Sequence, residues 1–253
     1  MPFADLEHLS LGEFIERERI PNALLLFIHI PKTAGSSLTE NLCCDLSPYS
    51  SIYVDQANLT GPYDQELSNV VQRFLANPHL REIRSASGHV PWSLAKAISE
   101  RLPDSRIVTI LRDPIERVVS DYRYQKSPAH PKHLEFRRAH PTIQSYLDDF
   151  NEANKMFRFM TDEISFGSGY EAIGKSFTFV GILEKHEKCV EVIYSLVGKR
   201  STRIGKANVT APTSDNTVDI TPELRSHIAE VNHLDVQLYR RVSARLDRAF
   251  WPE

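Results

Sequence analysis

Residues 31–37 read Pro-Lys-Thr-Ala-Gly-Ser-Ser; they follow an apolar run and precede a segment with helical spacing. The first backbone N–H groups of a helix bind anions, and a nearby lysine and hydroxyl groups strengthen that binding. We therefore predict that this loop holds a phosphate or sulfate group. The predicted contacts are Lys32, Thr33, Ala34, Gly35, Ser36 and Ser37. Taken alone, the loop also fits an ordinary turn between a strand and a helix.

This loop differs from the common ATP-binding P-loop, in which a lysine directly follows the last glycine. Here Lys32 precedes Gly35 by three residues, so we expect its side chain to approach the anion from the strand side. Thr33 comes before any helix and offers no clear equivalent of the Mg²⁺-binding hydroxyl. The chain has neither a carboxylate cluster nor the His and Cys spacing of a metal site, so we expect no metal cofactor.

A second candidate anion site combines Arg112 with Ser120. Arg112 ends the β-branched segment 106–112, and Ser120 lies eight residues later in a segment with helical spacing. A guanidinium group and a hydroxyl group suit a phosphate monoester, so we predict that this pair holds a second phosphate. The alternative is that Arg112 pairs with Asp113 or Glu116 and that Ser120 faces solvent.

His89 is the candidate general base. It follows Gly88 at the end of a short apolar segment, and histidine is the side chain whose ordinary pKa lies nearest to neutrality. The alternative is a structural histidine that hydrogen-bonds at a strand end. His29 lies inside the first apolar run, so we expect it to be a hydrogen-bonded core histidine.

Strands and helices are expected to alternate along the chain, which predicts an α/β fold with a central parallel sheet flanked by helices in three layers. The expected strands are 24–30, 51–54, 82–88, 106–112 and 177–182. The expected helices are 36–46, 64–76, 92–101, 114–126, 142–150, 151–161, 184–197 and 222–247. Ligands of such sheets bind beyond the carboxyl ends of the strands. The loop 31–37, His89 and Arg112 all follow strands there, so we predict one shared site.

Two segments resemble a known family. "HIPKTAGSSL" is similar to the 5′-phosphosulfate loop of sulfotransferases that use 3′-phosphoadenosine-5′-phosphosulfate (PAPS), and "TILRDPIERVVSDYRY" resembles their 3′-phosphate motif. The similarity is greatest to the branch that includes heparan sulfate 2-O-sulfotransferase and bacterial relatives. "SGHVPW", "NKMFRFM" and "FVGILEKHE" fit the same family in the same order, so the resemblance covers residues 24–198.

The resemblance implies a P-loop-like fold and transfer of a sulfuryl group from PAPS to an acceptor hydroxyl, with 3′-phosphoadenosine-5′-phosphate (PAP) as product. It implies that His89 deprotonates the acceptor and that Lys32 stabilises the departing phosphate. Asn154 and Arg158 match a family segment near the site and are candidate substrate contacts. Arg203 and Lys206 lie where the family has a loop that closes over the nucleotide.

The bulk composition limits the partners. The chain has 253 residues, 41% hydrophobic and 25% charged, with a net charge of −3, so we do not expect it to bind nucleic acid. No apolar run is long enough to span a bilayer, and no leader segment is evident, which favours a cytoplasmic protein. The mildly acidic balance favours a small-molecule or carbohydrate acceptor over a heavily sulfated polymer. We expect the three cysteines to be buried and unpaired.

We expect a single domain over residues 1–253, with a helical lead-in at 1–23, a motif-bearing core at 24–198 and a nucleotide-closing loop and helix at 199–253. Two alternatives to a sulfotransferase remain open at this point. One is a P-loop-like nucleotide kinase, and the other is a non-catalytic nucleotide-binding module. The oligomeric state is not predicted.

Overall fold

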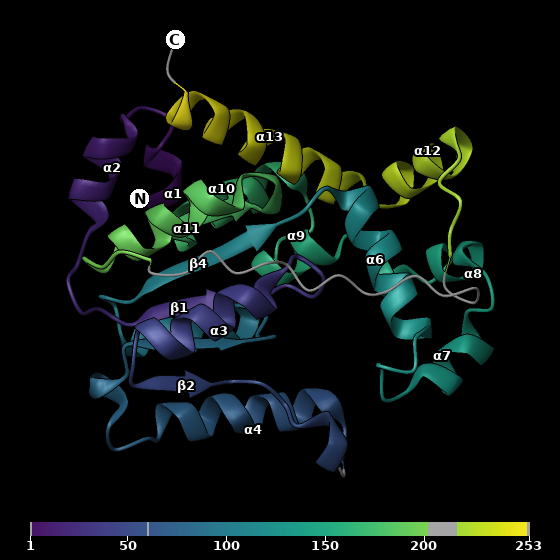
Figure 1. Ribbon diagram of the computed structural model, residues 1–253, viewed down its shortest axis with the longest axis horizontal. Coiled ribbons are helices and arrows are strands. Elements are labelled where there is room, and N and C mark those ends of the chain that lie inside the picture. Colours follow the sequence, from purple (N-terminus) through teal and green to yellow (C-terminus); the bar gives the residue numbers. More distant parts are fainter. Residues whose placement is uncertain (1, 60, 202–216, 252–253) are drawn as a thin grey trace.

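A computed structural model describes residues 2–59, 61–201 and 217–251 (Figure 1). Within them a five-stranded sheet has the order β2-β3-β1-β4-β5, and every neighbouring pair is parallel. The strands are β1 (Leu25–Ile28), β2 (Tyr49–Ser51), β3 (Ser85–Gly88), β4 (Arg106–Leu111) and β5 (Phe179–Ile182). The prediction of a parallel α/β sheet is confirmed.

Helices connect and cover these strands. The first seven are α1 (Pro2–Asp5), α2 (Leu11–Glu18), α3 (Gly35–Asp45), α4 (Tyr63–Leu75), α5 (Trp92–Arg101), α6 (Pro114–Lys126) and α7 (His133–Ala139). The others are α8 (Ile143–Leu147), α9 (Lys155–Met160), α10 (Phe166–Ser176), α11 (His186–Ser195), α12 (Pro222–Val231) and α13 (His233–Phe250). Short 3-10 turns lie at Gln56–Asn58, Leu80–Glu82, Phe150–Glu152 and Leu183–Lys185.

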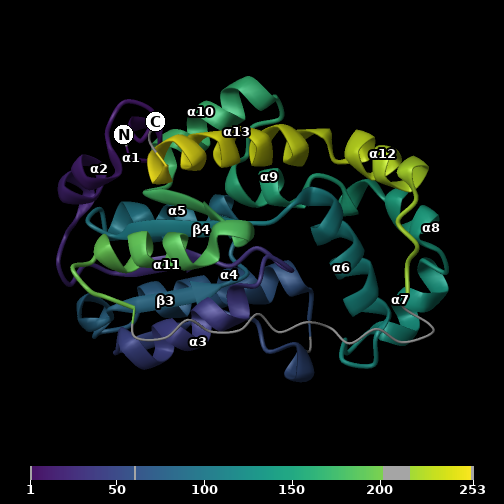
Figure 2. The same ribbon diagram turned by 45° about the horizontal axis from the view of Figure 1, so that its top comes forward.

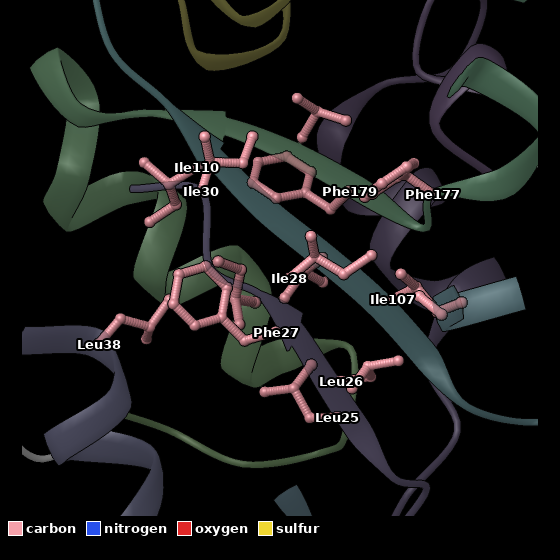
Figure 3. Close-up of a cluster of buried hydrophobic side chains, with 14 of the residues drawn as sticks. Leu25, Leu26, Phe27, Ile28, Ile30, Leu38, Ile107, Ile110, Phe177 and Phe179 are labelled. Carbon is pink, nitrogen blue, oxygen red and sulfur yellow. The ribbon is translucent and has the colours of Figure 1, made fainter. Parts of the chain in front are cut away.

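The central strands are apolar on both faces because helices cover both sides of the sheet. All four residues of β1 are buried, without the alternation of a half-exposed strand. Figure 3 shows these side chains beside those of β4 and the entry to β5. The labelled core residues are Leu25, Leu26, Phe27, Ile28, Ile30, Leu38, Ile107, Ile110, Phe177 and Phe179.

The helices form layers around the sheet. In Figure 2, α3 and α11 lie in front of the strands and α5 lies behind them, while α13 runs along the β5 side. In Figure 1, α4 lies beside β2 at the opposite edge. Helices α6, α7, α8 and α12 gather beyond the carboxyl end of β4, where Val118, Val119 and Tyr122 of α6 join a second, smaller apolar cluster.

The element boundaries required several corrections. β2 occupies Tyr49–Ser51 where a strand over 51–54 was expected, because its pairing with β3 starts earlier. The expected helices over 142–150 and 151–161 are the shorter α8 and α9. The expected helix over 222–247 is interrupted at Asn232, a buried residue that ends α12 and precedes α13. Helices α7 and α10 were not predicted.

The expectation for the cysteines was wrong for two of the three. Cys189 is buried, but Cys43 and Cys44 are exposed near the end of α3, because the buried face of that helix is formed by Leu38, Asn41 and Leu42. All three are free thiols. None of the helices in the described ranges is long and apolar enough to cross a membrane.

Candidate active site

The loop between β1 and α3 is shaped by left-handed backbone at two non-glycine residues. Lys32 has φ of 71° and Ala34 has φ of 61°. Ala34 is the N-cap of α3 and has no side-chain group to accept a hydrogen bond from the first helical amides. The hydroxyl of buried Thr33 donates to the Ile30 carbonyl at 2.9 Å and so holds the loop to the end of the strand. Such a turn into an uncapped helix start is suited to an anion.

Gly35 is required because a histidine ring lies against it. A Cβ atom placed on Gly35 would come within 2.1 Å of the His29 ring. His29 is 7% exposed, stacks on Phe27, and shares a hydrogen bond of 2.6 Å between its Nδ1 and the Tyr53 hydroxyl. It is the buried, hydrogen-bonded histidine that the sequence predicted.

Lys32 extends from this loop to helix α6. Its Nζ lies 4.1 Å from the centre of the Tyr124 ring, a cation–π contact that joins the first motif to the second. Burial lowers the pKa of Lys32, Asp121 opposes that change, and Arg112 adds to it. Lys32 is therefore a partly desolvated cation close to both Arg112 and Asp121.

Arg112 lies between the same two motifs. Its Nη1 donates to the Lys32 carbonyl at 3.3 Å, and its Nη2 is 3.9 Å from the Glu116 carboxylate, a long ion pair. Asp113 caps α6 by accepting from the amides of Ile115 and Glu116. Burial lowers the pKa of Arg112, with Glu116 the strongest opposing charge. The guanidinium group thus keeps hydrogen-bonding capacity for a ligand.

Ser120 is half-buried, two helical turns beyond the start of α6. Its neighbour Asp121 belongs to an ionic cluster beneath that helix, formed by Arg117, Asp121, Tyr146 and Lys155. Arg117, Tyr146 and Lys155 each donate to the Asp121 carboxylate at 3.0–3.1 Å. Burial alone would raise the pKa of Asp121, but Lys155 and Arg117 together lower it to about 2. The cluster ties α6 to α8 and α9.

His89 directly follows β3. Its Nδ1 lies 2.6 Å from the His29 carbonyl oxygen, which can only accept, so Nδ1 carries the proton and neutral His89 has its lone pair on Nε2. The His89 ring lies 4.5 Å from the His29 ring and 4.9 Å from the Tyr53 ring, centre to centre. Burial lowers the pKa of His89; the hydrogen bond to His29 and the charge of Asp121 oppose this, and Lys32 adds to it. His89 is therefore a largely neutral base at pH 7.

A neutral network extends behind His89. It consists of His29, Thr39, Tyr49, Tyr53 and Ser87, whose side chains are hydrogen-bonded in a chain. The Tyr53 hydroxyl contacts Thr39 Oγ1 at 3.1 Å, Thr39 contacts Ser87 Oγ at 3.1 Å, and Ser87 contacts the Tyr49 hydroxyl at 2.8 Å. His29 also supplies the carbonyl that orients His89. The network therefore helps to hold the imidazole of His89 in its position and tautomer.

Asn154 holds two helices together. Its side-chain oxygen accepts from the amides of Leu234 and Asp235 at the start of α13, and its amide nitrogen donates to the Val231 carbonyl at 3.2 Å. In return, Asp235 accepts from the amides of Met156 and Phe157 at the start of α9. Since Asn154 is 8% exposed and both polar atoms of its side chain are bonded, we leave it out of the proposed substrate contacts.

Arg158 is exposed and donates to the carbonyls of Phe150 and Asn151 at 3.2 Å each, so it supports the turn before α9. The candidate nucleotide contacts Arg203 and Lys206 lie outside the described residues. Among the residues that are described, no group of three or more His, Cys, Asp or Glu side chains could hold a metal ion.

Lys32, His89 and Arg112 thus meet at the carboxyl ends of three adjacent strands, β1, β3 and β4. A model of the family described as "Sulfotransferase family" matches residues 20–240. The chain belongs to the sulfotransferase family. No curated protein is similar enough in sequence to give a significant match.

Two solved structures are similar to this sulfotransferase. The crystal structure of a sulfotransferase from Alicyclobacillus acidocaldarius is 14% identical, with a TM-score of 0.50, and covers 90% of this chain and 99% of that chain. The crystal structure of mouse sulfotransferase SULT7A1 complexed with PAP is also 14% identical, with a TM-score of 0.53, and covers 97% of this chain and 95% of that chain. At this identity the likeness shows the fold, which is the predicted P-loop-like arrangement.

Several residues of this sulfotransferase site were not singled out from the sequence. Tyr124 is four residues after Ser120, on the same helical face, a spacing that could have suggested a shared environment. Arg117 and Asp121 also have the i, i+4 spacing of an ion pair. By contrast, Tyr53 lies near His89 because of the order of the strands, and Lys155 lies near Asp121 because of the packing of α9. The sequence has no local signal for either.

Proposed function

We propose that this sulfotransferase moves a sulfuryl group from PAPS to a hydroxyl-bearing acceptor, with His89 as general base and Lys32 as the main electrostatic group. The single observation that carries this proposal is the meeting of Lys32, Arg112 and His89 at three neighbouring strand ends. In the resembling family these positions serve the phosphosulfate, the 3′-phosphate and the acceptor proton. The membership of the chain in the sulfotransferase family supports the same assignment.

The residues present fit a phosphosulfate and a second phosphate. The uncapped start of α3 and the left-handed turn at Lys32 and Ala34 offer backbone donors to one anion. Ser36 and Ser37 add hydroxyl groups to the same loop. A second phosphate would be held by Arg112 and by Ser120, which is half-buried on α6. PAPS supplies the activated sulfuryl group, and the protein supplies its position.

The proposed reaction is an in-line transfer. Nε2 of neutral His89 takes the acceptor hydroxyl proton while the acceptor oxygen bonds to sulfur. The bond between sulfur and the bridging oxygen breaks, and PAP leaves with the negative charge. Lys32 and the loop amides stabilise that charge, and preorganised groups of this kind each lower the barrier by roughly 3–4 kcal/mol. The hydrogen bond between Nδ1 and the His29 carbonyl keeps His89 in the required tautomer.

Finer assignments rest on motif resemblance alone. We place the chain beside the heparan sulfate 2-O-sulfotransferase branch and its bacterial relatives, on the similarity of its motifs. Contacts of Arg158 with substrate, contacts of Arg203 and Lys206 with the nucleotide, and a cytoplasmic location stay predictions. The kinase alternative has no support from the family match, whereas a non-catalytic nucleotide-binding member of the family remains to be tested.

Two measurements test the proposal. PAP should raise the melting temperature of the protein more than ATP with Mg²⁺ does, and labelled sulfate should pass from PAPS to a hydroxylated acceptor. Stabilisation by ATP–Mg²⁺ but not by PAP would contradict the proposed donor. Tight PAP binding without transfer to any of a broad set of acceptors would favour the non-catalytic module.

The role of His89 has its own test. His89→Ala should bind PAP as the wild type does and lose transfer by about 10²- to 10⁴-fold, the usual contribution of a general base. The matched control is His79→Ala, which removes an exposed histidine outside the site. Full transfer by His89→Ala would remove this residue from the mechanism.

A further inference from the structure

A groove of about 470 Å³ lies between the loop that follows β2 and one face of α4. Its size falls in the range of about 300–1,000 Å³ that is usual for small-molecule sites. Its polar lining is formed by Tyr53, Asp55, Asn58, Gln65, Glu66, Asn69 and Arg73. The groove has no part in holding the two anions of the donor.

Tyr53 connects this groove to the proposed base. It lines the groove, and the centre of its ring lies 4.9 Å from that of His89, with the two rings edge to face. Its hydroxyl is hydrogen-bonded to His29 Nδ1 at 2.6 Å and to Thr39 Oγ1 at 3.1 Å, so the ring has a fixed position. A ligand in the groove that reaches past Tyr53 would therefore approach His89.

The polar side chains of the groove suit hydroxyl groups. Asn58, Gln65 and Asn69 carry amides, which both donate and accept, as a sugar hydroxyl does. These groups are already ordered by mutual bonds: Asn58 donates to Asp55 at 2.7 Å, and Asn69 donates to Glu66 at 3.1 Å. Gln65 donates to Asn69 at 3.3 Å, and an amide has two N–H donors and an oxygen with two lone pairs, so it can bond to a ligand as well as to a neighbour.

The charge of the groove argues against a polyanion. Asp55 and Glu66 are acidic and Arg73 is the single basic residue of the lining, so the lining carries a net charge of −1. Arg73 is also engaged by Glu66 at 2.6 Å. A sulfated or carboxylated polymer would meet repulsion here, whereas an uncharged polyhydroxylated molecule would not.

We propose that this groove is the acceptor site and that it takes an uncharged carbohydrate, whose hydroxyl is presented to His89 beside Tyr53. This inference rests on the proposed function. The acceptor oxygen gains the sulfuryl group, its proton passes to His89, and PAP is released from the donor. The groove and α4 determine which hydroxyl is presented.

The experiment compares two groove residues of α4 with a glutamine of the same helix that lies outside the groove. Gln65 lines the groove, whereas exposed Gln72 lies outside it. Transfer of labelled sulfate from PAPS is measured with a panel of neutral oligosaccharides, with heparan sulfate and with a simple phenol. The double variant Gln65→Ala/Asn69→Ala should raise the acceptor KM by about tenfold and leave PAP binding unchanged, since each lost hydrogen bond weakens binding. The control Gln72→Ala should behave as the wild type.

The outcomes separate this proposal from the proposed function. Equal acceptor KM values for the double variant and the control, in an active enzyme, would overturn the groove as the acceptor site. Preferred transfer to heparan sulfate or to the phenol, or PAP binding with transfer to no neutral oligosaccharide, would overturn the acceptor class. Failure of the wild type to bind PAP would instead overturn the proposed function.

Discussion

Two buried polar regions lie on either side of the anion-binding loop, and they are built from opposite chemistry. The neutral network behind His89 is a chain of hydroxyl and imidazole groups. The ionic cluster beneath α6 places one carboxylate, Asp121, against a buried arginine and a lysine. The neutral region orients a base that must stay uncharged, whereas the ionic region holds α6, the helix that follows Arg112 and carries Ser120. An uncharged base is thus held in place by uncharged groups, whereas the helix of the second anion site is held in place by a charged cluster.

The largest expected effect comes from breaking the ionic cluster. Asp121→Asn keeps the side-chain shape but removes the carboxylate that pairs with Arg117, which is fully buried, and leaves Lys155 with Glu152 as its remaining ion-pair partner. Removing one partner of a buried ion pair destabilises a protein by about 3–5 kcal/mol. Urea unfolding at pH 7 should show this loss, with exposed Asp162→Asn as the matched control. A loss no greater than that of the control would show that the cluster does not stabilise α6.

Acidic pH should weaken the ionic cluster without substitution. The pKa of Asp121 is about 2 in the folded protein, against an ordinary 3.8, so the folded state favours the charged form. The stability gained this way is present above pH 3.8, amounts to roughly 2 kcal/mol, and is lost as the pH falls toward 2. The difference in unfolding free energy between the wild type and Asp121→Asn should therefore shrink between pH 5 and pH 2. A difference that stays constant over this window would contradict the lowered pKa.

A smaller effect is expected in the neutral network. Tyr53→Phe removes the hydroxyl that bonds to His29 and Thr39 and leaves buried His29 with one unpaired nitrogen. An unsatisfied buried polar group costs about 1–3 kcal/mol, less than an unpaired buried charge. The same urea measurement, with the half-buried Tyr63→Phe as control, should place this variant between the control and Asp121→Asn. A loss larger than that of Asp121→Asn would reverse the comparison.

The smallest expected effect concerns Lys32, whose charge acts from the anion-binding loop on the histidines of the neutral region. The charge of Lys32 lowers the pKa of both His29 and His89, in addition to burial. Lys32→Gln should therefore raise the pKa of His89 toward its ordinary value, as followed by NMR titration of the imidazole. Lys126→Gln, which removes the lysine over the Tyr122 ring, serves as control. An unchanged or lower pKa in Lys32→Gln would contradict the proximity of the two groups.

The sequence predicted the meeting of the three motifs because parallel strands end at one edge of a sheet. Continuous apolar runs identified β1 and β4, and the polar residues after them therefore had to lie close together. The remainder of the site depends on contacts between distant segments. Tyr53 approaches His89 because β2 pairs with β3, and Lys155 reaches Asp121 because α9 packs near α6.

Tertiary contacts give Asn154 a structural role that the sequence around it does not indicate. Asn154 matched a family segment near the site, but it adopts a left-handed conformation and bonds to the start of α13. Its partner residues lie too far along the chain for spacing to reveal them.

The exchange of caps between α9 and α13 has a consequence for folding. Asn154 and Asp235 each satisfy the first amides of the other helix, although they lie about eighty residues apart in sequence. Neither short α9 nor the first turn of α13 can then open without exposing the end of its partner. We expect the amide protons of these two helix starts to exchange with deuterium as one unit, at a rate set by a shared opening. Helix α13, near the end of the chain, should then complete its fold together with α9, a helix from the middle of the chain.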